Sequence, residues 1–227
     1  MHTVRLPRWA VERGAGLNNF PALIHGRTAL VNIDMQNAFV AEGHVFGNRH
    51  ARHIVGRINA LSQAMRAIGA PVIWTRQTHT AEGVGAAPDW HYDHDVPGVS
   101  QAVAALTAGS EGHALYPEMH VADSDIVIDK HRYGGFSCPA GALPKALAER
   151  DVEMIVISGT LTNVCCESTA REAYMAGYKV IVVSDATAAV TDTEHNAALL
   201  NLRINFADVR RAEAVHSMIA SVHAARN

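Results

Sequence analysis

The most informative run of the sequence is Met154-Ile-Val-Ile-Ser-Gly-Thr-Leu-Thr-Asn-Val-Cys-Cys-Glu-Ser-Thr-Ala170. Its first four residues are apolar and β-branched or flexible, as expected for a buried strand. Gly159 and three further residues then lead to Asn163, a residue type that caps helices. The run therefore predicts a strand, a tight turn and a helix, and it places two cysteines in the first turn of that helix.

The two cysteines, Cys165 and Cys166, allow two interpretations. A thiol in the first turn of a helix faces the positive end of the helix dipole, which lowers its pKa and favours the nucleophilic thiolate. Free cysteines are also small apolar residues that pack helices onto sheets. The segment by itself supports both interpretations.

The same strand–helix alternation extends over the chain on both sides of this run. Apolar runs predict strands at 28–34, 70–75, 124–129, 153–158, 179–183 and 206–209, and helical spacing predicts helices at 50–69, 139–149, 163–176, 193–203 and 213–225. Such alternation predicts an α/β fold with a parallel sheet and helices on both faces. We expect an irregular N-terminal arm over 1–27, one domain over 28–227 and a long, functional loop over 77–98.

Composition excludes several classes of function. The 227 residues carry a formal net charge of −3, and no basic run exceeds two residues, so nucleic acid and anionic membranes are not expected partners. No apolar stretch approaches the roughly 18 residues that span a bilayer, and the N-terminus lacks a signal-peptide core. Three cysteines do not suggest a disulfide framework, which favours the cytoplasm.

Three chemically complementary side chains follow predicted strands: Asp34, Lys130 and Cys165. In parallel sheets, ligands bind beyond the carboxyl ends of the strands. An aspartate there can take a thiol proton, and a lysine can stabilise the resulting charge. Singly, Asp34 is better explained as a helix N-cap or a solvated strand-end carboxylate and Lys130 as a surface lysine, but together the three favour catalysis.

Three motifs in order resemble the isochorismatase-like cysteine hydrolase superfamily. They are Val31-Asn-Ile-Asp-Met-Gln-Asn-Ala-Phe39, Ile128-Asp-Lys-His-Arg-Tyr-Gly-Gly-Phe136 and the cysteine-bearing run above. The resemblance implies a Rossmann-like three-layer fold with a six-stranded parallel sheet, and a catalytic triad of Asp34, Lys130 and Cys165. Cys165 matches the nucleophile because it follows Thr-Asn-Val. Cys166 is then a packing residue, and Cys138 has no motif role.

The resemblance also implies the chemistry. A cis peptide between Thr160 and Leu161 would let the backbone N–H groups of Leu161 and Cys165 form an oxyanion hole. Cys165 would attack an amide carbonyl, and Asp34 would protonate the leaving amine and then activate water. The expected enzyme is a hydrolase of linear amides that forms a thioester and needs neither a cofactor nor a metal.

The second and third motifs are most similar to ureidoacrylate, biuret and N-carbamoyl amide hydrolases. Such substrates carry a urea or a carboxylate, for which arginine is the natural partner. The candidate substrate-binding residues are polar or cationic side chains near strand ends and aromatic side chains that wall a pocket: Arg76, Gln77, His79, Arg132, Tyr133, Phe39, Trp90 and Phe136.

Two alternatives remain open. One is a nicotinamidase-like or other simple amide hydrolase. The cluster Asp89-Trp-His-Tyr-Asp-His94 has metal-capable side chains, but its position differs from the metal site of nicotinamidases. The other is a non-catalytic, partner-binding member of the superfamily. The resemblance further implies a homo-oligomer, a dimer or a tetramer, to which the arm and the last helix could contribute.

Overall fold

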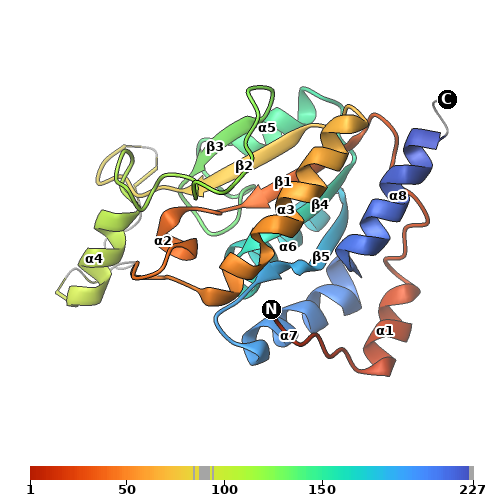
Figure 1. The fold of residues 1–227 in the computed structure, drawn as a ribbon, viewed down its shortest axis with the longest axis horizontal. Helices are drawn as coiled ribbons and strands as arrows, with labels where there is room; N and C mark the ends of the chain where they lie inside the picture. The colour runs from red at the N-terminus through yellow and green to blue at the C-terminus, as the bar shows by residue number, and fades with distance from the viewer. Residues whose placement is uncertain (84, 87–92, 94, 225–227) are drawn as a thin grey trace.

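A computed structural model describes residues 1–83, 85–86, 93 and 95–224 (Figure 1). Trp90 and all of the Asp89–His94 cluster except Asp93 lie outside the described residues.

The centre of the fold is one sheet of six strands. Every pairing is parallel, and the strand order is β3-β2-β1-β4-β5-β6. This confirms the predicted Rossmann-like sheet, whose order reverses between β1 and β4. The strands are β1 (Thr28–Ile33), β2 (Val72–Gln77), β3 (Ile126–Lys130), β4 (Met154–Thr160), β5 (Lys179–Ala188) and β6 (Asp208–Arg210).

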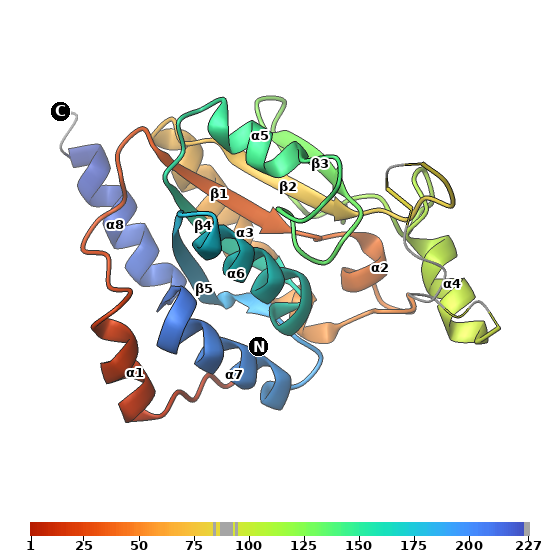
Figure 2. The ribbon, with the colours of Figure 1, turned by 180° about the vertical axis from the view of Figure 1, so that it is seen from behind.

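Helices cover both faces of the sheet (Figures 1 and 2). Helices α3 (Arg49–Ala67) and α8 (Ala212–Ala224) pack on one face. Helices α5 (Ala142–Ala148), α6 (Glu167–Met175) and α7 (Asp192–Asn201) pack on the other. Two π-helical segments, η2 (Thr162–Cys166) and η3 (Leu202–Phe206), adjoin α6 and α7.

The strand sequences explain this sandwich. The fully buried strand β1 sends Leu30 into the core beneath α3 and α8, while Ala29 and Val31 enter the opposite core. A strand buried on both faces is mostly apolar, and the buried polar side chain of Asn32 in β1 is hydrogen-bonded to Ser62 and Ser158. This apolar character makes the short runs of the sequence recognisable.

Three helices were not predicted: α1 (Arg8–Ala15), α2 (Asn37–Val40) and α4 (Pro97–Ala105). Helix α1 lies within the expected irregular arm, where Arg203 donates hydrogen bonds to the carbonyls of Val11 and Asn18. No residue of α4 is buried, so it carries no amphipathic pattern. Strand β5 extends to Ala188, five residues beyond the prediction.

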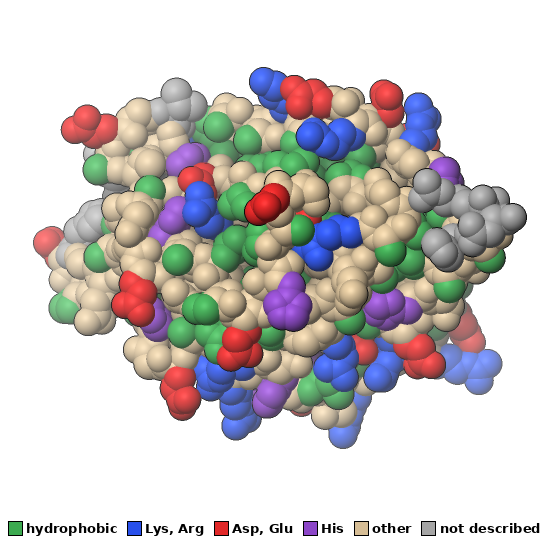
Figure 3. Space-filling model, turned by 45° about the horizontal axis from the view of Figure 1, so that its top comes forward, with side chains coloured by type: hydrophobic (Ala, Val, Ile, Leu, Met, Phe, Trp, Pro, Cys, Tyr) green, Lys and Arg blue, Asp and Glu red, His purple; other side chains and the backbone are tan. Residues whose placement is uncertain are grey.

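No helix of the described residues is both long and apolar enough to cross a bilayer. On the face drawn in Figure 3, acidic and basic side chains are interspersed.

Candidate active site

Asp34 leaves β1 in a left-handed backbone conformation, with φ of 48°. Asparagine and aspartate tolerate this region better than other non-glycine residues. The Asp34 N–H donates to the Thr75 carbonyl at 3.1 Å, and the Thr75 hydroxyl donates to Asp34 Oδ1 at 2.7 Å. The neighbouring strand β2 therefore fixes both the backbone and the carboxylate of a fully buried residue.

Lys130, the last residue of β3, faces this carboxylate. Its Nζ lies 2.8 Å from Asp34 Oδ2 and donates to Gln77 Oε1 at 2.7 Å and to the Arg132 carbonyl at 3.1 Å. Its side chain is 1 % exposed. Burial opposes the charged form, but Asp34 and Cys165 more than offset burial and raise the pKa of Lys130. The buried ammonium thus meets three oxygen acceptors.

Cys165 completes the group from η2, just past the end of β4. Its thiol is buried and interacts with both Asp34 and Lys130. Burial raises the pKa of Cys165; Lys130 opposes the shift and Asp34 adds to it. The expectation of a lowered thiol pKa is therefore wrong, because desolvation and Asp34 together outweigh Lys130. The resting residue is a thiol beside a potential proton acceptor.

Close contact between β1 and β4 shapes the turn before Cys165. Gly159 has φ of 112°, and a Cβ there would lie 2.1 Å from the Ile33 carbonyl oxygen. The Thr160–Leu161 peptide is cis, as the resemblance implied. The Leu161 carbonyl accepts the N–H groups of Val164 and Cys166, and Asn163 does not cap the helix. A non-glycine residue at 159 would push the cysteine-bearing turn away from β1.

A cavity of about 160 Å³ opens onto the thiol. It is smaller than the roughly 300–1,000 Å³ of drug-sized pockets, so it suits a small molecule. The described side chains that line it are mostly apolar. The rings of two of these residues, Phe39 and Phe46, stack with their centroids 5.4 Å apart. The lining residues are Phe39, Phe46, Gln77, His79, Ala102, Leu106, Tyr133, Leu161, Val164 and Cys165.

Four of the predicted substrate-binding residues line this cavity: Phe39, Gln77, His79 and Tyr133. Gln77 also accepts the hydrogen bond from Lys130, so it has a positioning role that the sequence did not suggest.

Three other predicted residues do not line the cavity: Arg76, Arg132 and Phe136. Arg76 pairs with Asp129, at 2.6 Å from Nε to Oδ1. The Arg132 guanidinium donates to backbone carbonyls in the loop before α4 and at His131. The Phe136 ring packs edge-on against Tyr178 in the core. These side chains are held by partners of their own.

The two remaining cysteines are buried away from the cavity lining. Cys166 is fully buried in the core on the α6 side of the sheet, as expected for a packing residue. Cys138 lies on the loop after β3, and its sulfur accepts the His131 N–H at 3.3 Å.

Sequence reasoning missed several supporting residues. Gln36 holds Gln77, because its Oε1 accepts the Gln77 N–H at 2.7 Å. Glu172 on α6 accepts two backbone N–H groups and the Ser137 hydroxyl from the loop after Lys130. The signal in the sequence was weak, since single polar residues on helices and strand ends usually face water.

One group of described residues has the composition of a metal site: His2, His50 and Asp192. However, His2 Nδ1 donates to Asp192 at 2.7 Å, and His2 Nε2 accepts the Ala189 N–H at 3.0 Å. Its ring stacks between the rings of His50 and His195, at 3.9 and 4.1 Å. Metal ligands point their lone pairs at the ion in the ring plane, so this stack fits an anchor for the N-terminus better than a metal site.

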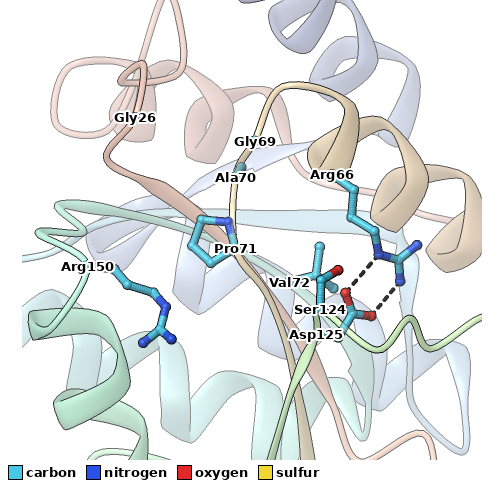
Figure 4. A pocket seen from close by; sticks show the side chains of 9 residues that line it. All are labelled: Gly26, Arg66, Gly69, Ala70, Pro71, Val72, Ser124, Asp125 and Arg150. Atoms are coloured by element: carbon cyan, nitrogen blue, oxygen red, sulfur yellow. Dashed lines mark hydrogen bonds and ion pairs between the residues drawn. The ribbon is translucent and has the colours of Figure 1, made fainter.

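A second hollow lies at the amino ends of the strands, opposite the thiol, and is lined partly by Arg66, Asp125 and Arg150 (Figure 4). The Arg66 guanidinium contacts both carboxylate oxygens of Asp125, at 2.8 and 2.5 Å. Arg150 donates to the Ala146 carbonyl. Of the two arginines in this hollow, Arg66 is paired with a carboxylate and Arg150 is bound to a backbone carbonyl. None of the predicted site residues that the structure describes lines the hollow.

Comparison with known proteins identifies the family of the chain. An isochorismatase domain matches residues 28–214. A ureidoacrylate amidohydrolase from Methylobacterium radiotolerans is 32% identical over 213 residues, which cover 87% of this chain and 81% of that protein. Nicotinamidase 3 of Arabidopsis thaliana is 29% identical over 79% of this chain and 82% of its own length.

A solved structure supports the same assignment. A cysteine hydrolase from Pseudomonas syringae pv. phaseolicola superposes with a TM-score of 0.80 at 29% identity, covering 91% of this chain and 98% of that one. The chain therefore belongs to the isochorismatase family and is a hydrolase of the amidohydrolase type.

Proposed function

We propose that this protein hydrolyses a C–N bond of a small ureido or N-carbamoyl amide, with Cys165 as the nucleophile. The observation that carries the proposal is a buried thiol at the cavity wall that interacts with the ion pair of Asp34 and Lys130. A thiol, a carboxylate and an ammonium in mutual contact supply a nucleophile, a proton acceptor and a fixed positive charge.

The first half of the reaction forms a thioester. As the Cys165 sulfur bonds to the carbonyl carbon, its proton passes to the Asp34 carboxylate. The carbonyl electron pair moves onto oxygen, and the N–H groups of Leu161 and Cys165 are proposed to receive it. When the carbonyl re-forms, the C–N bond breaks, and Asp34 gives the proton to the departing nitrogen.

The second half returns the enzyme to its starting state. Asp34 takes a proton from water as the water oxygen bonds to the thioester carbon. The carbon–sulfur bond breaks, and the proton returns from Asp34 to the sulfur. The sum is one amide and one water converted to one acid and one amine. Lys130 remains charged throughout, in keeping with its raised pKa, and offsets the negative charge shared by sulfur and carboxylate.

Similarity to a ureidoacrylate amidohydrolase supports a ureido substrate. A nicotinamidase-like simple amide is the second candidate, because Phe39 and Phe46 offer a flat apolar wall and a plant nicotinamidase is also similar.

Ammonia and amine release from ureidoacrylate, biuret, N-carbamoyl amino acids, nicotinamide and maleamate would rank these classes. We expect turnover of a ureido or N-carbamoyl compound that Cys165→Ser abolishes. Full turnover by Cys165→Ser would contradict the assigned nucleophile, and exclusive turnover of nicotinamide would favour the second candidate.

A further inference from the structure

The cavity wall beyond the thiol is chemically uniform. Among the described lining residues, most side chains are aliphatic or aromatic: Phe39, Phe46, Ala102, Leu106, Leu161 and Val164. Gln77, His79 and Tyr133 supply its polar atoms, and Gln77 Oε1 already accepts from Lys130. The group attached to the amide therefore meets mainly apolar surface.

The cations near the cavity are committed to other partners. Lys130 meets oxygen atoms of Asp34, Gln77 and Arg132 and also interacts with the Cys165 thiol. Arg76 is paired with Asp129. The Arg132 guanidinium binds the carbonyls of Gly85, Ala86 and His131.

The segment that joins His79 to α4, two parts of the cavity wall, is acidic in sequence. Residues 80–96 contain no lysine or arginine and four acids: Glu82, Asp89, Asp93 and Asp95. The segment therefore brings no lysine or arginine with which a substrate carboxylate could pair.

From these observations we propose that the site selects an uncharged amide with an apolar substituent and rejects a carboxylate-bearing one. This inference rests on the proposed hydrolysis at Cys165, and it separates the chain's substrate from ureidoacrylate, which is an anion. A carboxylate placed against Phe46 and Leu106 would lose its water without gaining a lysine or arginine partner among the described lining residues. We expect a selectivity for the neutral compound of about 100-fold or more in kcat/KM.

Matched substrate pairs test the inference. N-Propylurea has a methyl group where 3-ureidopropionate has a carboxylate. Butyramide and succinamate form a second pair with the same difference. In whichever pair is turned over, the neutral member should have the higher kcat/KM. Equal or faster turnover of the acid would overturn the inference while leaving hydrolysis at Cys165 intact.

If none of the four compounds is hydrolysed, the proposed ureido or simple-amide activity fails, but selectivity is still measurable. Ligand-observed NMR with the Cys165→Ala protein would compare the binding of butyramide and succinamate. Stronger binding of the neutral compound supports the inference, and stronger or equal binding of the acid overturns it.

Variants show whether the selectivity comes from the apolar cavity wall or from a nearby arginine. Arg76→Gln and Arg132→Gln should leave the neutral-to-acid ratio within about threefold of the wild-type ratio, because neither guanidinium lines the cavity. Phe46→Arg, at a half-buried wall position, should shift the ratio about tenfold toward the acid. A selective loss of the acid's turnover in Arg76→Gln or Arg132→Gln would show that an arginine reads a carboxylate, against the inference.

Discussion

Replacement of Lys130 by Met tests the buried ion pair in the most quantitative way. The ammonium and the Asp34 carboxylate are 1 % and 0 % exposed and 2.8 Å apart. Removing the cation leaves a buried carboxylate unpaired and takes the donor from Gln77 Oε1 and the Arg132 carbonyl. Breaking such a pair costs about 3–5 kcal/mol of unfolding free energy, which corresponds to a fall in Tm of about 10 °C in a chain of this length.

Urea denaturation and calorimetry at pH 7 would measure the loss, and an amide turnover assay would be expected to show no activity. The double variant Asp34→Asn, Lys130→Met removes the unpaired charge and should recover at least half of the lost stability. Lys145→Met is the matched control, since Lys145 is exposed and pairs only with Glu149, and it should lie within about 0.5 kcal/mol of wild type. A loss below about 1 kcal/mol in Lys130→Met, or no recovery in the double variant, would refute the reasoning.

Other substitutions test the remaining parts of the account. Cys166→Val should keep kcat/KM within about threefold of wild type, whereas Cys165→Ala should abolish turnover; a large loss in Cys166→Val would point to the other thiol. Gly159→Ala should cost at least about 3 kcal/mol in urea denaturation, because the new Cβ meets the Ile33 carbonyl, and a neutral result would contradict the close approach of the strands. Burial and nearby His2 lower the pKa of His195 to about 3, so the unfolded chain binds a proton there between about pH 6.5 and 3 while the folded chain does not. Stability should therefore fall by up to about 1.4 kcal/mol per pH unit as the pH drops through that window, and His195→Asn should flatten the slope; an unchanged slope would refute this origin.

The sheet was predictable because its strands are buried on both faces. Runs such as Met154–Ile157 and 179–183 are short, apolar and bounded by turn residues, so their number and parallel order followed from the alternation with helices. The three helices that escaped prediction lack this contrast. Helix α4 buries no side chain, and α2 is one turn long.

The sequence predicted which residues lie at the site, but it predicted less well which way their side chains point. The end of a strand brings Asp34, Lys130 and Cys165 to one edge, whatever their neighbours are. Arg76 contacts Asp129 because the two residues lie opposite each other on β2 and β3. The spacing of residues along the sequence does not specify this pairing. The raised pKa of Cys165 likewise depends on how deeply the folded chain buries the thiol, which the sequence does not show.

The central claim is that Cys165 forms a covalent acyl or carbamoyl intermediate. Acid quenching of the Cys166→Val protein during turnover, followed by digestion and tandem mass spectrometry, would locate the adduct without ambiguity between the adjacent thiols. We predict a mass increase equal to the acyl or carbamoyl group on Cys165, absent from Asp34→Asn if that carboxylate is the base. Sustained turnover with the adduct on Cys138, or full turnover by Cys165→Ser, would contradict the claim.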